Sequence, residues 1–405
     1  MDRPHHLVVF YSSRNRNSMN ALLGALQTSP VWENLRIHLP CRKNEVLETI
    51  KKYPESLLVL SIMTPDLPDA QKLIQECRLL SPPLLVCAGG PHVSAVPEDL
   101  LPWVDWLIPG EGEEAFSHLV EKWARGEIPE PPGIIRTSHR VELDQFPPFP
   151  SRIGIFGLIE VTRGCPYGCY YCQTSSIFGK DVRHRSVECI SGFLSGMKKK
   201  RLLDIRFITP NAFSYGSPDG FLLNLPAVSL LLEETKKITG KKGRIFFGSF
   251  PSEIRPEFVT PDSLRLLREF TDNDNVVLGA QSGSNRMLRA IGRGHTREDF
   301  LRAAELCRRY RYKVLVDFIF GLPGENEDDE KETLGAMKYL TDMGAMIHAH
   351  SFMPLPGTFF ALEKPVPISP FMKRQIGKMA RDGFLFGQWQ TQQKYAREMS
   401  TLKRG

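Results

Sequence analysis

The stretch Cys165-Pro166-Tyr167-Gly168-Cys169-Tyr170-Tyr171-Cys172 contains three of the chain's eight cysteines. This spacing allows one loop to hold three corners of a four-iron cluster, and Gly164 and Gly168 permit the positive-φ turns that such a loop requires. Because no fourth cysteine is near, one iron would remain open, and an open metal position binds a group that reacts. A structural zinc site and a chance grouping are the alternatives, although zinc would need a fourth Cys or His at knuckle spacing. The stretch therefore predicts a catalytic iron–sulfur cluster.

The residues around this loop resemble those of a known enzyme family. Tyr171 directly precedes the third cysteine, and Ile159-Glu160-Val161-Thr162-Arg163-Gly164 leads into the first. With these neighbours the loop is similar to the cluster loop of radical S-adenosylmethionine (SAM) enzymes. The resemblance implies that Cys165, Cys169 and Cys172 hold a [4Fe-4S] cluster, with Tyr171 beside SAM. It also implies that the open iron binds the amino and carboxylate groups of SAM. An electron from an external donor then cleaves SAM to a 5′-deoxyadenosyl radical.

The overall composition is that of a globular protein with two domains. The chain has 405 residues, 41% of them hydrophobic, which is enough for two cores of ordinary size. No stretch resembles a signal peptide, and no run of 18 or more apolar residues indicates a membrane span. The cysteine content favours a reducing cytoplasm over a disulfide scaffold. The net charge of +6 is modest, and the basic run Lys198–Arg201 is typical of a solvated helix end, so nucleic-acid binding is not predicted.

The first 125 residues predict a doubly wound parallel sheet. Apolar runs typical of buried strands alternate with segments of helical spacing at Met19–Leu26, 67–80 and 113–125. The predicted strands are Leu7–Tyr11, Leu57–Ser61, Leu84–Ala88 and Trp106–Ile108. Strands and helices that alternate in this way form a Rossmann-like α/β fold, in which ligands bind at the carboxyl ends of the strands.

The loops that follow these strands resemble those of the cobalamin-binding domain that precedes the cluster domain in one radical SAM subfamily. They are Ser61–Pro65, Gly89–His92 and Gly110–Glu113, and their glycines would let the backbone approach a bulky ligand. Tight turns without a ligand are the alternative. The resemblance implies that residues 1–125 bind cobalamin, with these residues at the cofactor: Ser61, Thr64, Gly89, Gly90, Pro91, His92, Gly110, Glu111 and Gly112.

The loop after the first strand departs from the usual cobalamin pattern. Its sequence, Ser12-Ser13-Arg14-Asn15-Arg16-Asn17-Ser18, lacks the D-x-H-x-x-G motif whose histidine ligates cobalt in other cobalamin proteins. We therefore expect that no histidine of this loop ligates cobalt, and that the nucleotide tail lies near Ser61, Thr64 and Gly89–Gly90. We interpret His92 as a strand-end histidine packed in a turn or on the corrin edge.

A proline-rich segment separates this domain from a second one. Residues 126–156 carry many prolines and no periodicity, which predicts a semi-rigid linker. Residues 157–360 predict six strands that alternate with helices, as in the partial (β/α)6 barrel of radical SAM enzymes, and residues 361–405 predict a helical extension. The six predicted strands are Leu158–Val161, Asp204–Thr209, Arg244–Ser249, Val276–Ala280, Val314–Phe320 and His348–Met353.

Residues at the carboxyl ends of the barrel strands are the candidates for SAM binding. Asn211 stands where many family members hold the SAM amino group, although its segment matches their Gly-Gly-Glu pattern poorly. Ser249, Glu253 and Arg255 follow the third strand. The two charged side chains suit the ammonium and carboxylate of a bound amino acid, and a surface ion pair between them is the alternative.

Two further strand ends carry segments similar to those of the family. Gln281 and Ser282 lie in Gly279–Ser284. Together with Arg293-Gly294-His295-Thr296, this segment resembles the one that lines the SAM pocket of radical SAM methylthiolases and their cobalamin relatives. The segment Phe320–Glu325 would offer a backbone edge to adenine.

His348 and His350 are two residues apart on the last predicted strand and therefore share a face. They face the substrate or, as we prefer, are core histidines with satisfied hydrogen bonds. Beyond residue 361 a helix is predicted around Trp389. This tail shows no small β-barrel of the kind that carries tRNA in methylthiolases, so a tRNA substrate is not predicted.

Taken together, the resemblance implies a cobalamin-dependent radical SAM methyltransferase that acts on an unactivated carbon. In that chemistry the 5′-deoxyadenosyl radical abstracts a hydrogen atom, and methylcobalamin donates its methyl group to the carbon radical. The chain is similar to smaller two-domain proteins of anaerobic archaea. This implies a protein or peptide substrate, such as a glutamine in the alpha subunit of methyl-coenzyme M reductase. The alternatives are a rearrangement or cyclisation enzyme acting on a small molecule and a non-catalytic cobalamin-binding sensor.

Overall fold

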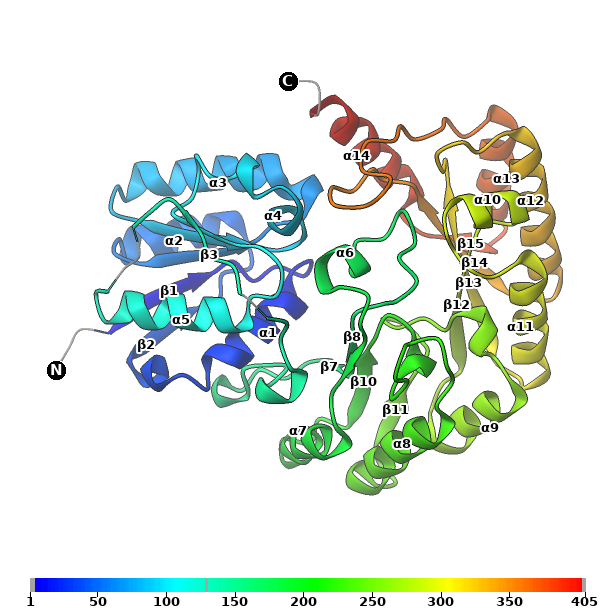
Figure 1. Cartoon of the computed structure of the whole chain (residues 1–405), viewed down its shortest axis with the longest axis horizontal. Helices are drawn as coiled ribbons and strands as arrows, with labels where there is room; N and C mark the ends of the chain where they lie inside the picture. The colour runs from blue at the N-terminus through cyan, green and yellow to red at the C-terminus, as the bar shows by residue number, and fades with distance from the viewer. Residues whose placement is uncertain (1–3, 128–129, 138, 403–405) are drawn as a thin grey trace. The chain divides into compact units, whose positions relative to one another are not determined.

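The chain folds into two compact units, Met1–Leu158 and Ile159–Gly405 (Figure 1). The computed structural model describes residues 4–127, 130–137 and 139–402. Both units are α/β structures built on parallel strands, which confirms the predicted fold class. Within the described residues, no helix combines the length and the apolar character needed to cross a bilayer.

The first unit contains one six-stranded sheet in the order β2-β1-β3-β4-β5-β6, and all neighbouring strands are parallel. The strands are β1 (His5–Val9), β2 (Leu35–His38), β3 (Leu57–Ser61), β4 (Leu85–Gly89), β5 (Trp106–Ile108) and β6 (Gly133–Ile134). The strand order reverses between β1 and β3, because the chain leaves β1 toward β2 and returns on the other side to β3. Ligands of open α/β sheets bind at such a switch point.

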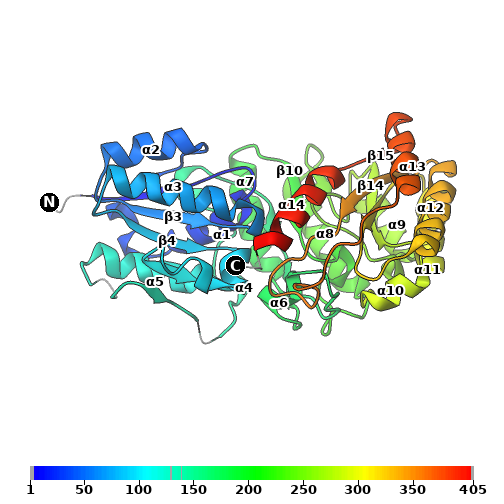
Figure 2. The ribbon, with the colours of Figure 1, turned by 90° about the horizontal axis from the view of Figure 1, so that it is seen from above.

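Helices cover both faces of this sheet, as Figures 1 and 2 show. They are α1 (Arg16–Leu26), α2 (Lys43–Lys52), α3 (Leu67–Leu80), α4 (Pro91–Ala95) and α5 (Glu113–Ala124). Because successive side chains of a strand point to opposite faces, Leu7 and Val9 pack with α1 and α5, while Val8 packs with α2 and α3. The near-continuous apolar strands thus supply two cores.

The sequence analysis missed β2 and α2. Strand β2 lies at the edge of the sheet, where Arg36 is exposed and only Leu35 is buried. Helix α2 buries only Val46 and Ile50, four residues apart, and its other positions are largely polar. Two apolar residues on one face provide too weak a periodic signal to predict a helix.

Part of the segment predicted as a linker belongs to the first unit. Strand β6 lies inside residues 126–156 and pairs with β5. Farther along, Phe149 is buried, and its carbonyl oxygen accepts a hydrogen bond from Gln27 Nε2 at 2.9 Å. Gln27 Oε1 in turn accepts from Arg152 N at 3.0 Å. Pro129, one of the prolines on which the linker prediction rested, lies outside the described residues.

The second unit contains the six strands predicted for the barrel and a seventh, at Leu385–Phe386, that was not predicted; all are parallel to their neighbours. They form a three-stranded sheet, β11-β10-β7, and a four-stranded sheet, β12-β13-β14-β15. A parallel bridge pairs Leu278 with Ile254, which lies in the segment between β11 and β12. The strands are β7 (Ile159–Glu160), β10 (Asp204–Ile208), β11 (Arg244–Phe246), β12 (Asn275–Gln281), β13 (Lys313–Phe320), β14 (Met346–Ser351) and β15 (Leu385–Phe386). A short antiparallel pair, β8 (Thr162–Arg163) and β9 (Arg183–His184), flanks the cysteine loop.

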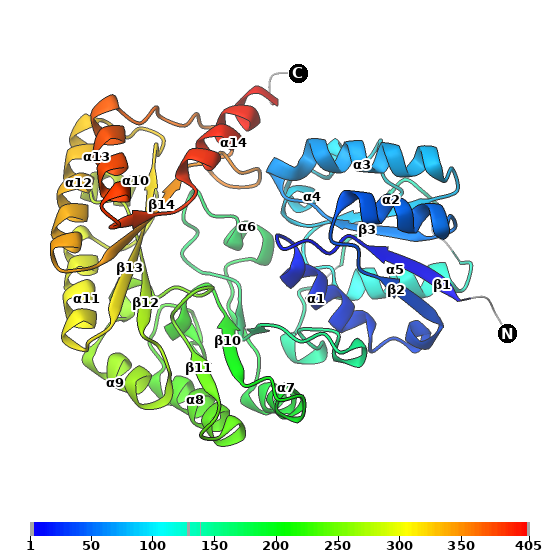
Figure 3. The ribbon, with the colours of Figure 1, turned by 180° about the vertical axis from the view of Figure 1, so that it is seen from behind.

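The strands of this unit lie on the inner side of an arc, and most of the helices cover its outer side (Figure 3). The helices are α6 (Thr174–Phe178), α7 (Val187–Lys199), α8 (Leu225–Thr239), α9 (Pro261–Phe270), α10 (Asn285–Ala290), α11 (Arg297–Arg309), α12 (Glu327–Asp342), α13 (Pro370–Arg381) and α14 (Trp389–Leu402). Burial alternates along β13, and Phe318 meets Phe300 of α11 edge-on, with ring centroids 5.9 Å apart. The buried series of β13 therefore faces the helices, and the half-buried series faces the interior of the arc.

The last described residues complete the second sheet. Strand β15 pairs in parallel with β14, and the predicted helix around Trp389 is α14, which packs against β14. The 361–405 segment is thus part helix and part strand.

The turn after β13 holds a buried carboxyl group. Glu325 is 8% exposed and its Oε2 accepts hydrogen bonds from Gly321 N at 2.7 Å and Leu322 N at 3.3 Å. Burial nevertheless raises the pKa of Glu325 to about 7, and the nearby Glu330 adds to this effect.

Replacing Gly24 of α1 by alanine should destabilise the first unit. The new Cβ would lie 2.2 Å from the Pro147 carbonyl oxygen and 2.9 Å from Phe149 N, and such overpacking costs about 1–3 kcal/mol. The matched control is Gly192→Ala on α7, where a Cβ meets no atom within 4 Å, so that alanine should stabilise the helix by about 0.5–1 kcal/mol. Calorimetric unfolding of both variants tests the difference, and shifts of the same sign would contradict it.

Glu325→Gln should remove a pH dependence from the stability of the second unit. The pKa of Glu325 is about 7 in the fold against an ordinary 4.5, so the charged form destabilises the fold increasingly as the pH rises through this range. Glutamine keeps an oxygen that accepts from the two backbone N–H groups. The variant should therefore match wild type near pH 4 and exceed it by up to about 3 kcal/mol near pH 8. Urea unfolding at both pH values would refute this if the difference did not change.

Candidate functional site

The cysteine loop follows β8 and is fixed by backbone contacts. Gly164 and Gly168 have φ values of 88° and 61°, as the sequence predicted. A Cβ on Gly164 would lie 2.2 Å from the Asp181 carbonyl oxygen, so no other residue fits there. Cys165 N donates to Gly179 O at 3.1 Å, and Tyr170 N donates to Ile291 O at 3.0 Å. The loop is therefore held at both its beginning and its middle.

The three sulfur atoms suit a cluster rather than a single ion. Burial raises the pKa of the Cys165 and Cys172 thiols, and the neighbouring cysteines raise it further. Cys169 is buried and the other two cysteines are half-buried, so three thiolates held together here would need a shared cationic partner. Three thiolates on one zinc ion would stand about 3.8 Å apart. Among the described residues, however, the cysteines do not form a group whose donor atoms all lie within 4.8 Å of one another. The three sulfur atoms therefore do not stand at the spacing of three ligands on one zinc ion.

Arg255 supports the cysteine loop. Its side chain is 2% exposed, and its guanidinium carbon lies 3.3 Å from the centroid of the Tyr167 ring. Its Nε donates to Glu257 Oε1 at 2.6 Å, and its Nη2 donates to the Arg293 carbonyl oxygen. The alternative of a surface ion pair between Glu253 and Arg255 is therefore wrong, because Arg255 is buried and pairs with Glu257.

Glu253 instead meets Arg293, at 3.5 Å. Arg293 also donates to Gly279 O at 2.8 Å, and its Nη1 lies 3.8 Å from Cys169 Sγ. Although burial alone lowers the pKa of Arg293, its neighbours Tyr171, Glu253 and Cys169 raise it above the ordinary value, so the guanidinium keeps its charge. Burial raises the pKa of Glu253, and Arg293 opposes this shift. An ion pair thus stands directly beside the cluster loop.

Gln281 and Ser282 lie at the carboxyl end of β12, where the strand is irregular. The pairing of β12 with β13 shifts between Gly279 and Gln281, and Gln281 has a φ of 74°, in the left-handed region that side chains rarely adopt. Strained residues of this kind cluster at ligand sites. Ser282 has a different role, because its buried hydroxyl meets the Thr333 hydroxyl at 3.4 Å and accepts from Ser284 N at 3.2 Å. It anchors the turn to α12.

Among the buried polar atoms that lack a hydrogen-bond partner within the described residues, three belong to candidate residues of this site. They are Asn211 Nδ2, Ser249 Oγ and Arg293 Nε. Asn211 and Ser249 follow β10 and β11 at their carboxyl ends, and buried polar atoms without a partner are what a polar ligand would satisfy. The residues present therefore fit the charged amino-acid end of SAM. Sequence reasoning had named Arg293 only as part of a motif; its position beside Glu253 depends on contacts between distant segments.

At the switch point of the first unit, two contacts connect the segment that follows β1 with the end of β3 and the residues after it. Ser18 Oγ lies 3.1 Å from Ser61 Oγ, and Arg14 forms an ion pair with Asp66. Thr64 is buried, and its hydroxyl lies 3.2 Å from His92 Nδ1. His92 Nε2 lies 3.2 Å from Asp99 Oδ2. Both ring nitrogens of His92 thus face protein atoms, as expected of a histidine packed in a turn.

The glycines of the predicted cobalamin loops differ in what surrounds them. A Cβ on Gly90 would lie 2.7 Å from Ile62 N and from Ser61 Oγ, so the fold itself requires this glycine. Gly110 has a φ of 79° and no atom within 4 Å of its Cβ position, so the space beside it is open. Glu111 is buried, and its Oε2 accepts from Val141 N at 3.0 Å. Ser61, Gly89, Gly90, Pro91, Gly110 and Gly112 are half-buried at the strand ends.

His348 and His350 are not core residues. Both are half-buried and lie on the face of β14 that Asp317 occupies on β13. Sequence reasoning missed Asp317 entirely, because a single aspartate inside an apolar strand has no motif around it. Burial lowers the pKa of His350, and His348 lowers it further.

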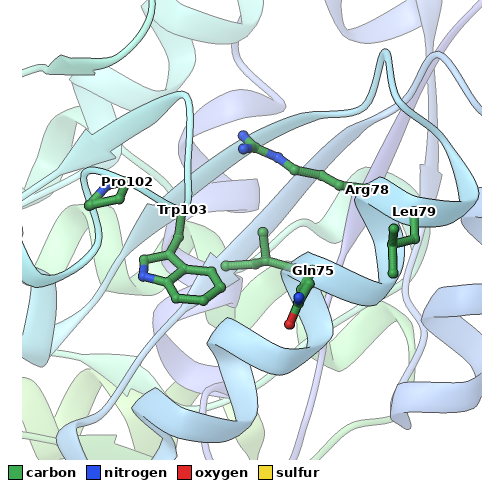
Figure 4. A pocket seen from close by; sticks show the side chains of 6 residues that line it. Gln75, Arg78, Leu79, Pro102 and Trp103 are labelled. Carbon is green, nitrogen blue, oxygen red and sulfur yellow. The ribbon is translucent and has the colours of Figure 1, made fainter.

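A pocket of about 240 Å³ lies elsewhere, on the first unit (Figure 4). Its lining is mostly apolar and comes from α3 and the turn before β5: Ile74, Gln75, Arg78, Leu79, Pro102 and Trp103. The charged member, Arg78, pairs with Asp105 at 3.0 Å. The pocket therefore offers little polar chemistry and is not the candidate site.

Comparison with known families divides the chain as its structure does. Residues 18–120 match the B12 binding domain, and residues 159–337 match the Radical SAM superfamily. An uncharacterized methyltransferase of Pyrococcus horikoshii is 24% identical over 394 residues, which cover 84% of this chain and 80% of the relative. A tRNA-2-methylthio-N(6)-dimethylallyladenosine synthase of Pelobacter propionicus is 28% identical and covers 68% of this chain and 61% of its own length.

Solved structures share the two-unit fold. The radical SAM methyltransferase TsrM from Kitasatospora setae, with cobalamin and a [4Fe-4S] cluster bound, has a TM-score of 0.65 at 17% identity and covers 89% of this chain and 74% of its own. The cobalamin-dependent radical enzyme OxsB, with aqua-cobalamin and SAM bound, has a TM-score of 0.64 at 16% identity. The match covers 95% of this chain and 56% of the OxsB chain.

Replacing Cys165, Cys169 and Cys172 together by alanine should abolish cluster binding, because no sulfur ligand would remain in the loop. Iron and sulfide content and the visible absorption of the anaerobically reconstituted protein measure the loss. Cys41→Ala, which changes an exposed cysteine far away in the sequence, is the control and should retain a full cluster. A full cluster in the triple variant would sink the assignment.

The two matched families and the chemistry of the residues agree. The B12-binding family accounts for the first unit, and the radical SAM family accounts for the cysteine loop and the strand ends beside it. The cofactors are accordingly a [4Fe-4S] cluster, SAM and cobalamin. With a B12-binding domain followed by a radical SAM domain, the chain belongs to the cobalamin-dependent radical SAM enzymes.

Proposed function

We propose that this enzyme is a methyltransferase that methylates an unactivated carbon. The observation that carries the proposal is the presence of both domains in one chain, most of which resembles the Pyrococcus horikoshii methyltransferase. A carbon without an acidic hydrogen cannot be methylated after simple deprotonation. When bound, the cluster and SAM supply the radical that removes the hydrogen atom, and cobalamin supplies the methyl group.

In the second unit, the residues of the chain would hold the cluster and orient SAM. Cys165, Cys169 and Cys172 would hold the cluster, and the loop contacts described above keep their spacing. The half-buried Glu253 and the buried Arg293 form a pair of opposite charges that can exchange partners with the ammonium and carboxylate groups of SAM. Polar atoms of four further residues would complete the SAM pocket: Tyr171, Asn211, Ser249 and Gln281. Arg255 and Ser282 would act as positioning residues.

In the first unit, the residues that would contact cobalamin differ from those that already bond to other protein atoms. Ser61, Gly89, Pro91, Gly110 and Gly112 are half-buried at the carboxyl edge of the sheet and would face cobalamin. Thr64, His92 and Glu111 already have protein partners and would shape the loops. We infer that cobalt receives no histidine from this chain.

The substrate class is the finer part of the proposal. A protein substrate, such as the glutamine of the methyl-coenzyme M reductase alpha subunit, rests on sequence resemblance alone. One solved structure of TsrM contains tryptophan as its substrate, and that fold neighbour therefore acts on a small molecule. Because the chain shares its fold with TsrM, a small molecule is the stronger candidate.

The test uses the anaerobically reconstituted full chain with cobalamin, a reductant and SAM that carries a ¹³C-methyl group. The methyl label should appear on cobalamin, and cleavage of SAM should release 5′-deoxyadenosine. Neither product requires the natural substrate. Ser18→Trp, at the switch point, should block cobalamin loading while cleavage of SAM persists. The cysteine triple variant should lose cleavage.

Other outcomes separate the alternatives. A rearrangement or cyclisation enzyme would produce 5′-deoxyadenosine without labelling cobalamin. A non-catalytic sensor would do neither. Mass spectrometry of tryptophan and of a peptide that carries the reductase glutamine, each incubated with the labelled enzyme, then compares the small-molecule and protein classes.

A further inference from the structure

A cluster of three metal-ligating side chains lies inside the second unit, outside the residues assigned above. Asp317 of β13 is the register partner of His348 on β14, and His350 lies two residues farther along the same face. The neighbouring residue Phe318 points the opposite way, toward Phe300 of α11. The three side chains therefore face the interior of the arc of strands.

Their donor atoms converge. Asp317 Oδ1 lies 2.9 Å from His348 Nδ1, and His348 Nδ1 lies 3.2 Å from His350 Nε2. All three atoms fall within 4.8 Å of one another, and no other such group occurs among the described residues. Neighbouring ligands at about 2.1 Å from one octahedral ion stand about 3 Å apart, which is close to the two shorter separations.

Without an ion, one ring nitrogen must serve two partners. His348 Nδ1 is the atom shared by both contacts, and it can carry either one proton or one lone pair. If it donates to Asp317, it presents no lone pair to His350. If it accepts from His350, it faces the Asp317 carboxylate as a second acceptor. An ion bound to all three atoms uses one lone pair of each and removes the conflict.

We propose that Asp317, His348 and His350 bind one divalent metal ion. Two imidazoles and one carboxylate form a three-ligand set that suits Fe²⁺, Mn²⁺ or Zn²⁺ and leaves coordination positions open toward the interior. An oxygen or nitrogen atom of a substrate inside the barrel could occupy such a position and be oriented by it. This site goes beyond the proposed methyl transfer and does not depend on it.

The C-terminal residues form the surroundings of the site. The ring of Phe386 on β15 stacks on His348, with centroids 4.6 Å apart and an interplanar angle of 13°. Gln392 of α14 bridges Ser351 N, which donates to its Oε1 at 2.8 Å, and His350 Nδ1, which lies 3.4 Å from its Nε2. A metal on His350 Nε2 places the ring proton on Nδ1, where it faces the amide nitrogen. Glutamate at position 392 would accept from both groups.

The experiment titrates Mn²⁺ into the reconstituted full-length protein and follows the paramagnetic resonance signal of the free ion. Mn²⁺ is the probe because oxygen and imidazole ligands bind it better than thiolates do. We expect one Mn²⁺ per chain, displaced by Zn²⁺. Asp317→Asn and His348→Ala should each weaken binding by at least about tenfold, and Gln392→Glu should strengthen it, because a carboxylate behind a ligating histidine raises affinity.

The chain offers a matched control. His6 Nδ1 and His38 Nε2 are also close, at 2.9 Å, but have no third ligand, so His6→Ala should leave Mn²⁺ binding unchanged. Unchanged iron content and circular dichroism must show that Asp317→Asn, which keeps the side-chain shape, is folded. The proposal is overturned if wild type takes up no Mn²⁺, or if Asp317→Asn and His348→Ala bind it as wild type does. Loss of binding in these variants with SAM cleavage intact would support it without bearing on methyl transfer.

Discussion

The organisation of the second unit depends on one buried cation, the guanidinium of Arg293. A buried charge is tolerated only where partners compensate it, and Arg293 has three: Glu253, the Gly279 carbonyl oxygen and the sulfur of Cys169. These partners come from the segments after β11, on β12 and in the cysteine loop. A Cβ on Gly279 would lie 2.4 Å from Arg293 Nη2, so glycine is needed for the approach. The cluster loop is therefore positioned by electrostatics as much as by packing.

Local patterns in the sequence predicted what is locally determined. The cysteine spacing, the glycines of the loop and the apolar strands each depend on neighbouring residues, and the structure agrees with them. The ion pairs depend on which strands are adjacent. Arg255 and Glu253 are two residues apart but point to different partners, because the chain between them bridges to β12 through Ile254. No single-sequence pattern contains that information.

Glycine-rich loops illustrate a second limit. In sequence, Gly90 and Gly110 look alike, since each follows a strand and precedes a helix. In the fold Gly90 is required by the backbone of Ile62, whereas Gly110 has open space beside it. Internal packing and ligand approach impose the same residue type for different reasons, and only the folded structure distinguishes the two. The same holds for His348 and His350, whose shared face was predictable but whose partner Asp317 was not.

The participation of β15 and α14 in the inner face has a consequence for biosynthesis. The strand that pairs with the edge of β14, the ring stacked on His348 and the amide that accepts from Ser351 N all come from residues 385–402. This face cannot take its final form until that segment has left the ribosome, long after the cysteine loop has emerged. Newly made chains must therefore present an open, unfinished barrel during the interval in which iron and sulfide can first reach the cysteines.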